Sequence, residues 1–243
     1  MILITRPFEE AQILAKEFTK LNLNTVMDPL ISFKSTYRKI KFKENSYYLV
    51  SSLQAVKSLL KYQNQYSEIL NEGRFLVIGK KVRNELKKNN NIRIKKITEN
   101  SDEMYDYLIK NKLLFKNKFN LIYLSGSIIN NDFLRALKHK KISVKRVIIY
   151  KVIPTKKLKR KTVSLLKQNK IKQIVLFSSY TAHTLIKLLS SEKLKKKVSK
   201  IQVFSLSDRI DKYVKKSRFF EKTFVSAKPN QQSLIKVLTL KKQ

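Results

Sequence analysis

The sequence predicts an α/β fold in which parallel sheets are flanked by helices. Strand-like apolar runs alternate with helix-like segments almost without exception along the 243 residues. Two stretches, Tyr47–Val56 and Ile174–His183, repeat one unit, an apolar run that stops at a Ser-Ser pair and continues as a helical pattern. The strand–helix units that follow the two copies keep nearly the same spacing. This repetition indicates two halves that are built alike.

Each expected element follows from its local pattern. Apolar residues recur at helical spacing from Ala11 to Phe18, which predicts a helix over Phe8–Leu21. Leu30–Lys41 follows Pro29 without helical periodicity, so we expect an extended segment there. Up to Lys110, the pattern further predicts strands at Ile2–Thr5, Thr25–Met27, Tyr47–Val50, Phe75–Ile78 and Ile92–Ile97, helices that end near Tyr62 and Lys88, and a helix over Asp102–Lys110.

The second half of the chain continues the alternation. Val144–Val152 is expected to be a strand that Pro154 closes, with Tyr150 near its end. Lys156–Lys161 is interpreted as a solvated linker or the start of a helix. The remaining predicted strands are Leu121–Leu124, Ile174–Phe177, Ile201–Leu206 and Thr223–Ser226, and the remaining helices follow Ser178, end near His139, or span Asp208–Lys215 and Gln231–Leu240.

The strand count divides evenly between the middle and the ends of the chain. Five predicted strands fall within about residues 46–151, and the two ends together supply five more. A chain of this length can hold two domains of roughly 100–130 residues each. The count therefore suits two flavodoxin-like lobes.

Composition excludes several classes of protein. The chain has no cysteine, which excludes a disulfide framework and a thiolate metal site. The opening MILITRPFEE reaches acidic residues after a few apolar ones, so we expect a strand there and no signal peptide. No apolar run approaches the roughly 18 residues that cross a bilayer. We therefore expect a soluble, cytoplasmic protein with no membrane partner.

The net charge of +37 allows three interpretations. A basic field is typical of nucleic-acid binding. However, the lysines are spread along the whole chain, and no helix-turn-helix, RNP or zinc pattern is present. Lys, Asn and Ile are abundant throughout, so we favour the compositional bias of an AT-rich genome and consider a nucleic-acid partner unfavoured. Within that bias, the same field would draw a polyanionic small substrate into a cleft.

Hydroxyl-bearing loops are expected at one edge of each sheet. Ligands of parallel sheets bind where loops leave the carboxyl ends of the strands, and helix N-termini there attract anions. A single serine at such a place is more commonly a helix cap than a ligand contact, but here the feature recurs. The loops are Thr5-Arg6-Pro7, Ser51-Ser52, Gly79-Lys80, Ser125-Gly126-Ser127, Ser178-Ser179-Tyr180-Thr181, Ser207 and Pro229-Asn230.

Signatures of the common enzyme mechanisms are missing from the sequence. It has no GxGxxG, no GxxxxGK[ST], no G-x-S-x-G and no metal-ligand cluster. The two histidines, His139 and His183, are expected to face solvent or to pack. An enzyme of this kind would depend on binding and orientation more than on strong acid–base groups.

Seven short motifs, taken in order, resemble the uroporphyrinogen-III synthase family. They are ILITRP at the start, the strand–SS–AV unit, VIG before a helix, YLSG, VIIY, LFSS followed by Ala182, and a late AxP. Each motif is weak alone, but their order and spacing match over the whole chain.

The resemblance implies a two-lobed protein with its active site in the cleft between the lobes. The outer lobe would be discontinuous, 1–34 plus 160–243, around a middle lobe of 44–150, with linkers at 35–43 and 151–159. The family converts hydroxymethylbilane, a linear tetrapyrrole with eight carboxylates, to uroporphyrinogen III in heme biosynthesis, with inversion of ring D and loss of water. A monomeric lyase that needs no cofactor or metal is implied, with hand-over of its substrate from hydroxymethylbilane synthase.

The same resemblance implies roles for individual residues. Tyr150 matches a tyrosine of the family that has been proposed as the acid for loss of the terminal hydroxyl; without the resemblance, we would interpret it as a packed strand-end aromatic. Gly79 and Gly126 match loop glycines that let backbone N–H groups approach carboxylates. Substrate contacts are implied for Thr5, Arg6, Ser51, Ser52, Gly79, Gly126, Ser178, Ser179, Thr181 and Ser207.

Five positions depart from the family pattern. Val82 and Ile210 stand where threonine is frequent, and Ser207 stands where the first copy has glycine. Gln54 replaces a basic residue, and Ser125 replaces an arginine. Together with the high positive net charge, these departures leave two alternatives open. One is a diverged tetrapyrrole- or polyanion-binding protein without turnover, and the other is a basic nucleic-acid-associated protein.

Overall fold

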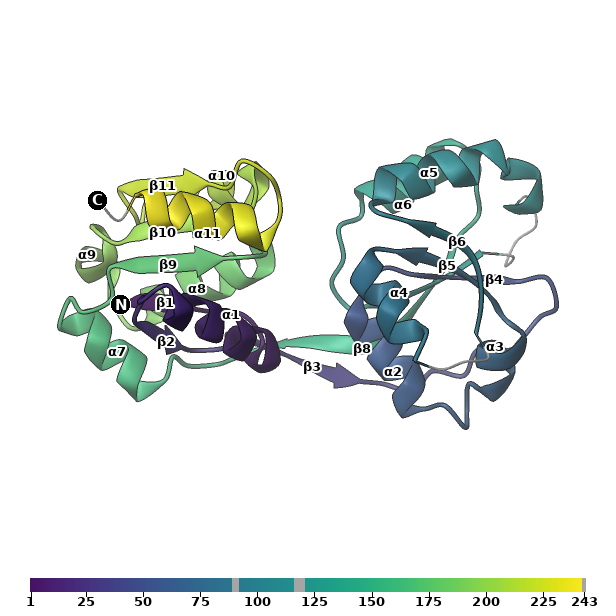
Figure 1. Ribbon diagram of the computed structural model, residues 1–243, viewed down its shortest axis with the longest axis horizontal. Helices are drawn as coiled ribbons and strands as arrows, with labels where there is room; N and C mark the ends of the chain where they lie inside the picture. Colours follow the sequence, from purple (N-terminus) through teal and green to yellow (C-terminus); the bar gives the residue numbers. More distant parts are fainter. Residues whose placement is uncertain (89–91, 116–120, 242–243) are drawn as a thin grey trace. The chain divides into compact units, whose positions relative to one another are not determined.

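The chain forms two compact units, seen in a computed structural model that describes residues 1–88, 92–115 and 121–241 (Figure 1). Unit 1 comprises Met1–Ser32 and Ile153–Gln243, and unit 2 comprises Phe33–Val152. These divisions fall near the linkers expected at 35–43 and 151–159, and at both places the chain runs as continuous strand: β3 (Ile31–Ser35) and β8 (Lys145–Pro154).

Unit 1 is a parallel sheet with the strand order β11-β10-β9-β1-β2. Its strands are β1 (Ile2–Ile4), β2 (Thr25–Met27), β9 (Gln173–Leu176), β10 (Gln202–Ser205) and β11 (Lys222–Val225). Its helices are α1 (Phe8–Lys20), α7 (Arg160–Lys167), α8 (Ser179–Ser191), α9 (Lys195–Val198), α10 (Asp208–Ser217) and α11 (Gln231–Leu240).

Strand alternation gives the unit 1 sheet an apolar core on each face. In β1, Leu3 points into the core that α7, α8 and α10 cover, while Ile2 and Ile4 point into the core under α1 and α11. Helix α1 buries Ala11, Leu14 and Phe18, the stripe that the sequence predicted. Both faces of the sheet are therefore covered by helices, as its continuous apolar strands require (Figure 1).

Unit 2 is a sheet with the strand order β3-β8-β7-β4-β5-β6. Besides β3 and β8, its strands are β4 (Tyr47–Val50), β5 (Arg74–Ile78), β6 (Arg93–Thr98) and β7 (Leu121–Gly126). Its helices are α2 (Leu53–Lys61), α3 (Ser67–Glu72), α4 (Lys80–Leu86), α5 (Ser101–Lys110), the 3-10 turn η1 (Lys112–Phe115) and α6 (Asp132–His139).

The elements of unit 2 cover both faces of its sheet. Helices α2, α3 and α4 pack on one face, and α5, η1 and α6 pack on the other. The segment expected to be merely extended is an edge strand, β3, beside β8, and the Thr36 N–H donates to the Ile149 carbonyl at 2.8 Å. The short helices α3 and α9 and the turn η1 are additions that the apolar pattern did not predict, because they are too short to show a period.

The two sheets share one strand order once the chain ends are permuted. If β9, β10 and β11 are matched with β4, β5 and β6, and β1 and β2 with β7 and β8, both sheets have the same sequence of neighbours. The predicted repeat is thereby confirmed, because Ser51 and Ser178 both follow the central strand of a sheet. If the strands of each unit are renumbered from 1 to 5 in chain order, leaving out β3, unit 1 has the flavodoxin-like order 2-1-3-4-5. Unit 2 has the order 3-2-1-4-5 in the same numbering.

Candidate functional site

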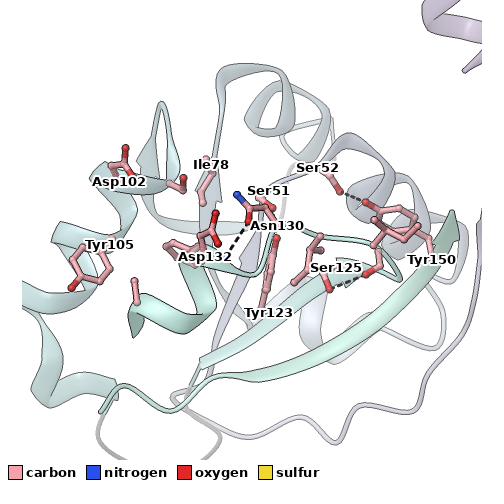
Figure 2. Close-up of a pocket in the computed structure, with 16 residues that line it drawn as sticks. Ser51, Ser52, Ile78, Asp102, Tyr105, Tyr123, Ser125, Asn130, Asp132 and Tyr150 are labelled. Carbon is pink, nitrogen blue, oxygen red and sulfur yellow. Dashed lines mark hydrogen bonds between the residues drawn. The ribbon is translucent and has the colours of Figure 1, made fainter. Parts of the chain in front are cut away.

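A cavity of about 730 Å³ opens at the carboxyl edge of the unit 2 sheet (Figure 2). It lies beside the neighbouring strands β4 and β7, where the strand order reverses and where α/β sheets bind their ligands. Its size is typical of small-molecule sites. The cavity brings together four residues that the sequence predicted for the site: Ser51, Ser52, Gly126 and Tyr150.

Two tyrosine–serine hydrogen bonds cross the base of the cavity. The hydroxyl of Tyr150 on β8 lies 3.1 Å from Ser52 Oγ, and the hydroxyl of Tyr123 on β7 lies 2.8 Å from Ser51 Oγ. Ser52 is also the N-cap of α2, where its Oγ accepts the Ala55 N–H. The serine pair that ends β4 therefore holds two phenol groups, one from each of two neighbouring strands.

A β-bulge directs Tyr150 toward the cavity. In the pairing of β7 with β8, Ser125 is opposite Ile148 while the next residue, Gly126, is opposite Tyr150, so β8 holds one extra residue. As a result Ile149 and Tyr150 break the usual alternation and join the same core cluster. Tyr150 is 7% exposed, and its ring meets the ring of Phe33 edge-on with centroids 5.8 Å apart.

The loop after β7 fits closely around Tyr150. A Cβ built on Gly126 would lie 2.4 Å from Tyr150 Cζ and 2.7 Å from its hydroxyl, so this position needs glycine for the ring to fit. The Ser127 N–H donates to the Tyr150 carbonyl at 2.9 Å. Arg146 secures the loop, because its guanidinium donates to Ser125 Oγ and to the carbonyls of Gly126 and Ser127. The backbone around the phenol is thus held from both strands.

Burial keeps the Tyr150 phenol protonated. Its removal from water is the largest influence and raises the pKa of Tyr150 above the ordinary value. The Ser52 hydrogen bond lowers this pKa, nearby Tyr123 raises it, and the positive charge of Arg146 lowers it. The net direction is upward, so the phenol, which is protonated near neutral pH even at its ordinary pKa, keeps its proton to higher pH.

The wall of the cavity mixes apolar and polar groups. Ile78, Tyr105 and Phe133 supply apolar surface, and Asp102 and Asp132 lie at the starts of α5 and α6. Among the described residues that line the cavity, none is lysine or arginine. The strong positive charge of the chain is therefore not concentrated on this wall.

Gly79 lies at the edge of the site without lining it. Its φ of 95° lies in the region that favours glycine, and it precedes α4. Its N–H donates to the Thr98 carbonyl at 2.8 Å, so that group is engaged within the sheet edge. Its neighbour Ile78 lines the cavity. The approach of the Gly79 N–H to a substrate carboxylate stays a prediction, and the bond to Thr98 would have to break for it.

In unit 1, the predicted residues lie at the carboxyl ends of β1 and β9. Thr5 is fully buried and its hydroxyl donates to the Val175 carbonyl at 3.1 Å, so this hydroxyl is engaged within the sheet, and its contact with a substrate stays a prediction. Arg6 donates to Glu10 and, at 2.6 Å, to Gln231 Oε1, with its guanidinium 4.1 Å from the Phe177 ring centroid. A substrate carboxylate would have to compete with Glu10 for it.

The hydroxyl cluster after β9 begins helix α8. Ser178 is the N-cap: its Oγ accepts the Thr181 N–H at 3.1 Å and lies 2.7 Å from Thr181 Oγ1. Thr181 is buried at 3% exposure, while Ser178 and Ser179 are half-buried. Ser207 is the N-cap residue of α10 after β10. These serines stand where the repeat predicts, and their contact with a substrate stays a prediction.

The departures from the family pattern have a structural basis. Val82 and Ile210 are 6% and 4% exposed and pack into the cores beneath α4 and α10, so both positions contribute apolar packing. At Ser125, which stands in place of an arginine, the side-chain Oγ accepts a hydrogen bond from the Arg146 guanidinium at 2.9 Å. Gln54, in the first turn of α2, is not among the described residues that line the cavity.

Two residues of the site were not predicted from the sequence. Tyr123 lies inside the apolar run LIYLSG and Arg146 inside KRVIIY, so both appear as ordinary strand residues. The sequence did offer one signal for Tyr123: it is a tyrosine in an apolar strand, two residues before the Ser125-Gly126 loop. A buried tyrosine hydroxyl usually needs a hydrogen-bond partner, and the loop could supply one. Arg146 could be placed only through the pairing of β7 with β8.

The described residues contain neither a cluster suited to a metal ion nor a helix suited to span a membrane. There, no group of three or more histidine and acidic side chains is placed to hold a metal ion. Over the same residues, every helix is too short or too polar to span a membrane.

These features define a two-unit α/β protein with a small-molecule site at the carboxyl edge of a parallel sheet. A family model described as uroporphyrinogen-III synthase HemD matches residues 12–236. The chain belongs to the uroporphyrinogen-III synthase family, as its motifs predicted. No curated protein sequence matched the chain.

Solved structures support the fold. The chain is similar to a uroporphyrinogen-III synthetase from Helicobacter pylori 26695, with a TM-score of 0.68, 14% identity, and coverage of 100% of this chain and 99% of that one. It is also similar to a mutant uroporphyrinogen III synthase from the extremely thermophilic bacterium Thermus thermophilus, with a TM-score of 0.58, 12% identity, and the same coverage. At these identities the similarity establishes the fold, and the activity is argued from the family and the site.

Proposed function

We propose that this chain acts as a uroporphyrinogen-III synthase, closing hydroxymethylbilane to uroporphyrinogen III with inversion of ring D and loss of water. The observation that carries the proposal is the family match over residues 12–236. The site agrees with it, because the phenol that the resemblance singled out, Tyr150, reaches the edge of the unit 2 sheet at which such folds bind ligands. The family favours neither alternative, the binding protein nor the nucleic-acid-associated protein.

The first chemical step needs a proton at the departing hydroxyl. The C–O bond of the hydroxymethyl group breaks, the Tyr150 proton moves to the oxygen, and water leaves while the pyrrole nitrogen supplies electrons to the methylene carbon. Ring closure later releases one proton from the terminal ring, which restores the Tyr150 phenol directly or through solvent. The Tyr150 phenol starts protonated, and although burial makes it a weaker acid, the Ser52 hydrogen bond and the charge of Arg146 both stabilise the phenolate that the step leaves.

The lining of the cavity indicates which part of the substrate enters it. Carboxylates would meet Asp102 and Asp132 there and no cation among the described lining residues, whereas pyrrole rings would meet Ile78, Tyr105 and Phe133. We therefore expect the reacting end of the bilane to enter by its ring faces. Its carboxylate side chains would stay in solvent, within the field of the basic surface.

The test of the function is a product analysis. The purified chain is mixed with freshly made hydroxymethylbilane, and the oxidised uroporphyrin isomers are separated by chromatography. Bilane left alone cyclises to isomer I, so an excess of isomer III over a heat-denatured control establishes ring inversion. Isomer I alone, from a protein that is folded by circular dichroism, would refute the proposal and favour binding without turnover.

Four finer features of the family remain part of the proposal. We propose turnover without cofactor or metal, a monomeric and cytoplasmic protein, and receipt of the unstable bilane from hydroxymethylbilane synthase. Full activity after dialysis against a chelator would support the first. A rise in the isomer III fraction when the two enzymes are mixed, greater than free diffusion of bilane predicts, would support the last.

A further inference from the structure

We propose that Tyr123 is a second catalytic phenol, which donates a hydrogen bond to the departing hydroxyl while Tyr150 gives it a proton. This inference rests on the proposed function and adds a residue to it. Tyr123 lies on β7, beside the strand that carries Tyr150, and its side chain lines the same cavity. Figure 2 shows both rings extending from these strands toward the serine pair.

Tyr123 lies on the face of the sheet that α5, η1 and α6 cover, and its ring packs in part against their core. Its neighbours in β7, Ile122 and Leu124, are buried, while Tyr123 itself is only half-buried. It pairs with Leu49 of β4, and its hydroxyl lies 2.8 Å from Ser51 Oγ beyond the end of that strand, so its ring extends toward the carboxyl edge. A tyrosine here places a hydroxyl in the cavity that leucine or isoleucine could not supply.

The hydrogen-bond inventory leaves both phenol protons available. Ser52 Oγ accepts the Ala55 N–H, and its own proton can be donated to the Tyr150 oxygen. Ser51 Oγ can donate to the Tyr123 oxygen in the same way, since either atom of that pair can be the donor. With both serines donating, the O–H groups of Tyr123 and Tyr150 are free to point into the cavity.

Two donors at one oxygen match the charge that develops there. As the C–O bond breaks, negative charge gathers on the departing oxygen, and a hydroxyl oxygen has two lone pairs. Tyr150 transfers its proton to one of them, and Tyr123 donates a hydrogen bond to the other and keeps its proton. The products of the step are water, the Tyr150 phenolate and the cationic pyrrole end, so atoms and charge balance. Preorganised donors of this kind act mainly on kcat.

A purely structural role predicts a different result. If the Tyr123–Ser51 bond only ties β7 to β4, removing either hydroxyl should cost stability, by a similar amount, and leave the rate of the folded protein unchanged. The matched case is Tyr66, 1% exposed and outside the cavity, whose hydroxyl accepts the Arg38 N–H at 3.0 Å and donates to the Arg38 carbonyl at 2.9 Å. Tyr66→Phe removes a bonded hydroxyl from unit 2 without touching the site.

The experiment measures isomer III formation and thermal stability for four proteins: wild type, Tyr123→Phe, Ser51→Ala and Tyr66→Phe. We expect Tyr123→Phe to lower kcat by about 100-fold with little change in KM. Ser51→Ala should lower kcat less, because the Tyr123 hydroxyl remains but loses its orientation. Tyr66→Phe should lower the melting temperature and keep the wild-type kcat.

The outcomes separate this inference from the function on which it rests. Wild-type formation of isomer III with a Tyr123→Phe kcat within twofold of wild type overturns the inference alone. Isomer I only from the wild type overturns the proposed function, and the inference falls with it. A loss of kcat in Tyr66→Phe as large as in Tyr123→Phe would also overturn the inference, because the loss would then follow stability.

Discussion

Replacing Gly126 by alanine should misplace the Tyr150 phenol and reveal how closely the rate depends on its position. The added Cβ would lie 2.4 Å from Tyr150 Cζ and 2.5 Å from Cε2, whereas ordinary contact begins at 3.4 Å. The ring must therefore retreat by about 1 Å, and a misplacement of that size in a catalytic group costs about 100-fold in rate. Overpacking of this kind also costs about 1–3 kcal/mol of stability.

A control and a double variant separate the two effects. Gly73→Ala creates a comparable clash in unit 2, with a Cβ 2.2 Å from the Ile69 carbonyl oxygen, but away from the cavity. It should lose stability and keep its kcat. In a Tyr150→Phe background, Gly126→Ala should lower the rate little further, since the hydroxyl that it displaces is already absent.

The assay is the rate of isomer III formation at saturating bilane, with urea unfolding run on each variant. A Gly126→Ala protein whose kcat stays within twofold of wild type would refute the reasoning. So would a double variant that loses the full product of the two single effects, because the glycine and the phenol would then act independently.

Four further results are expected. Tyr150→Phe should lower kcat without unfolding the protein. Because burial raises the pKa of Tyr150, the wild-type pH–rate profile should show no fall that is due to this group until the pH passes 10, its ordinary pKa. A fall assigned to Tyr150 near pH 8 would contradict this expectation. Arg146→Gln should loosen the Ser125–Ser127 loop, lower kcat and raise the pKa of Tyr150, which NMR of labelled tyrosine can follow. Burial raises the pKa of fully buried Tyr48 to about 12, so its contribution to the free energy of unfolding is fully present below pH 10 and is lost as the pH rises to 12. In chemical unfolding, the stability difference between wild type and Tyr48→Phe should therefore change by roughly 3 kcal/mol over that range. Ser178→Ala should cost about 1 kcal/mol through loss of the α8 cap, again by chemical unfolding, and an unchanged stability would show that the cap is dispensable.

The local pattern was sufficient for most elements because each depends on its own periodicity. The helix predicted over Gln231–Leu240 and the strand over Thr25–Met27 have the same bounds in the structure. The repeat of the Ser-Ser unit was a local signal of a global property, since it identified equivalent central strands before any pairing was known. Short elements such as α3 and α9 lacked enough residues to show a period.

The sequence alone determined the class of fold, the family and the presence of hydroxyls at the carboxyl ends of strands, because motifs and apolar periods are properties of neighbouring residues. Only the tertiary structure decided which of those residues line one cavity. Thr5 proved to be buried, whereas Tyr123 and Arg146 entered the site through the pairing of β7 with its neighbours. The bulge that directs Tyr150 depends on the register between two strands distant in sequence, which no local pattern encodes.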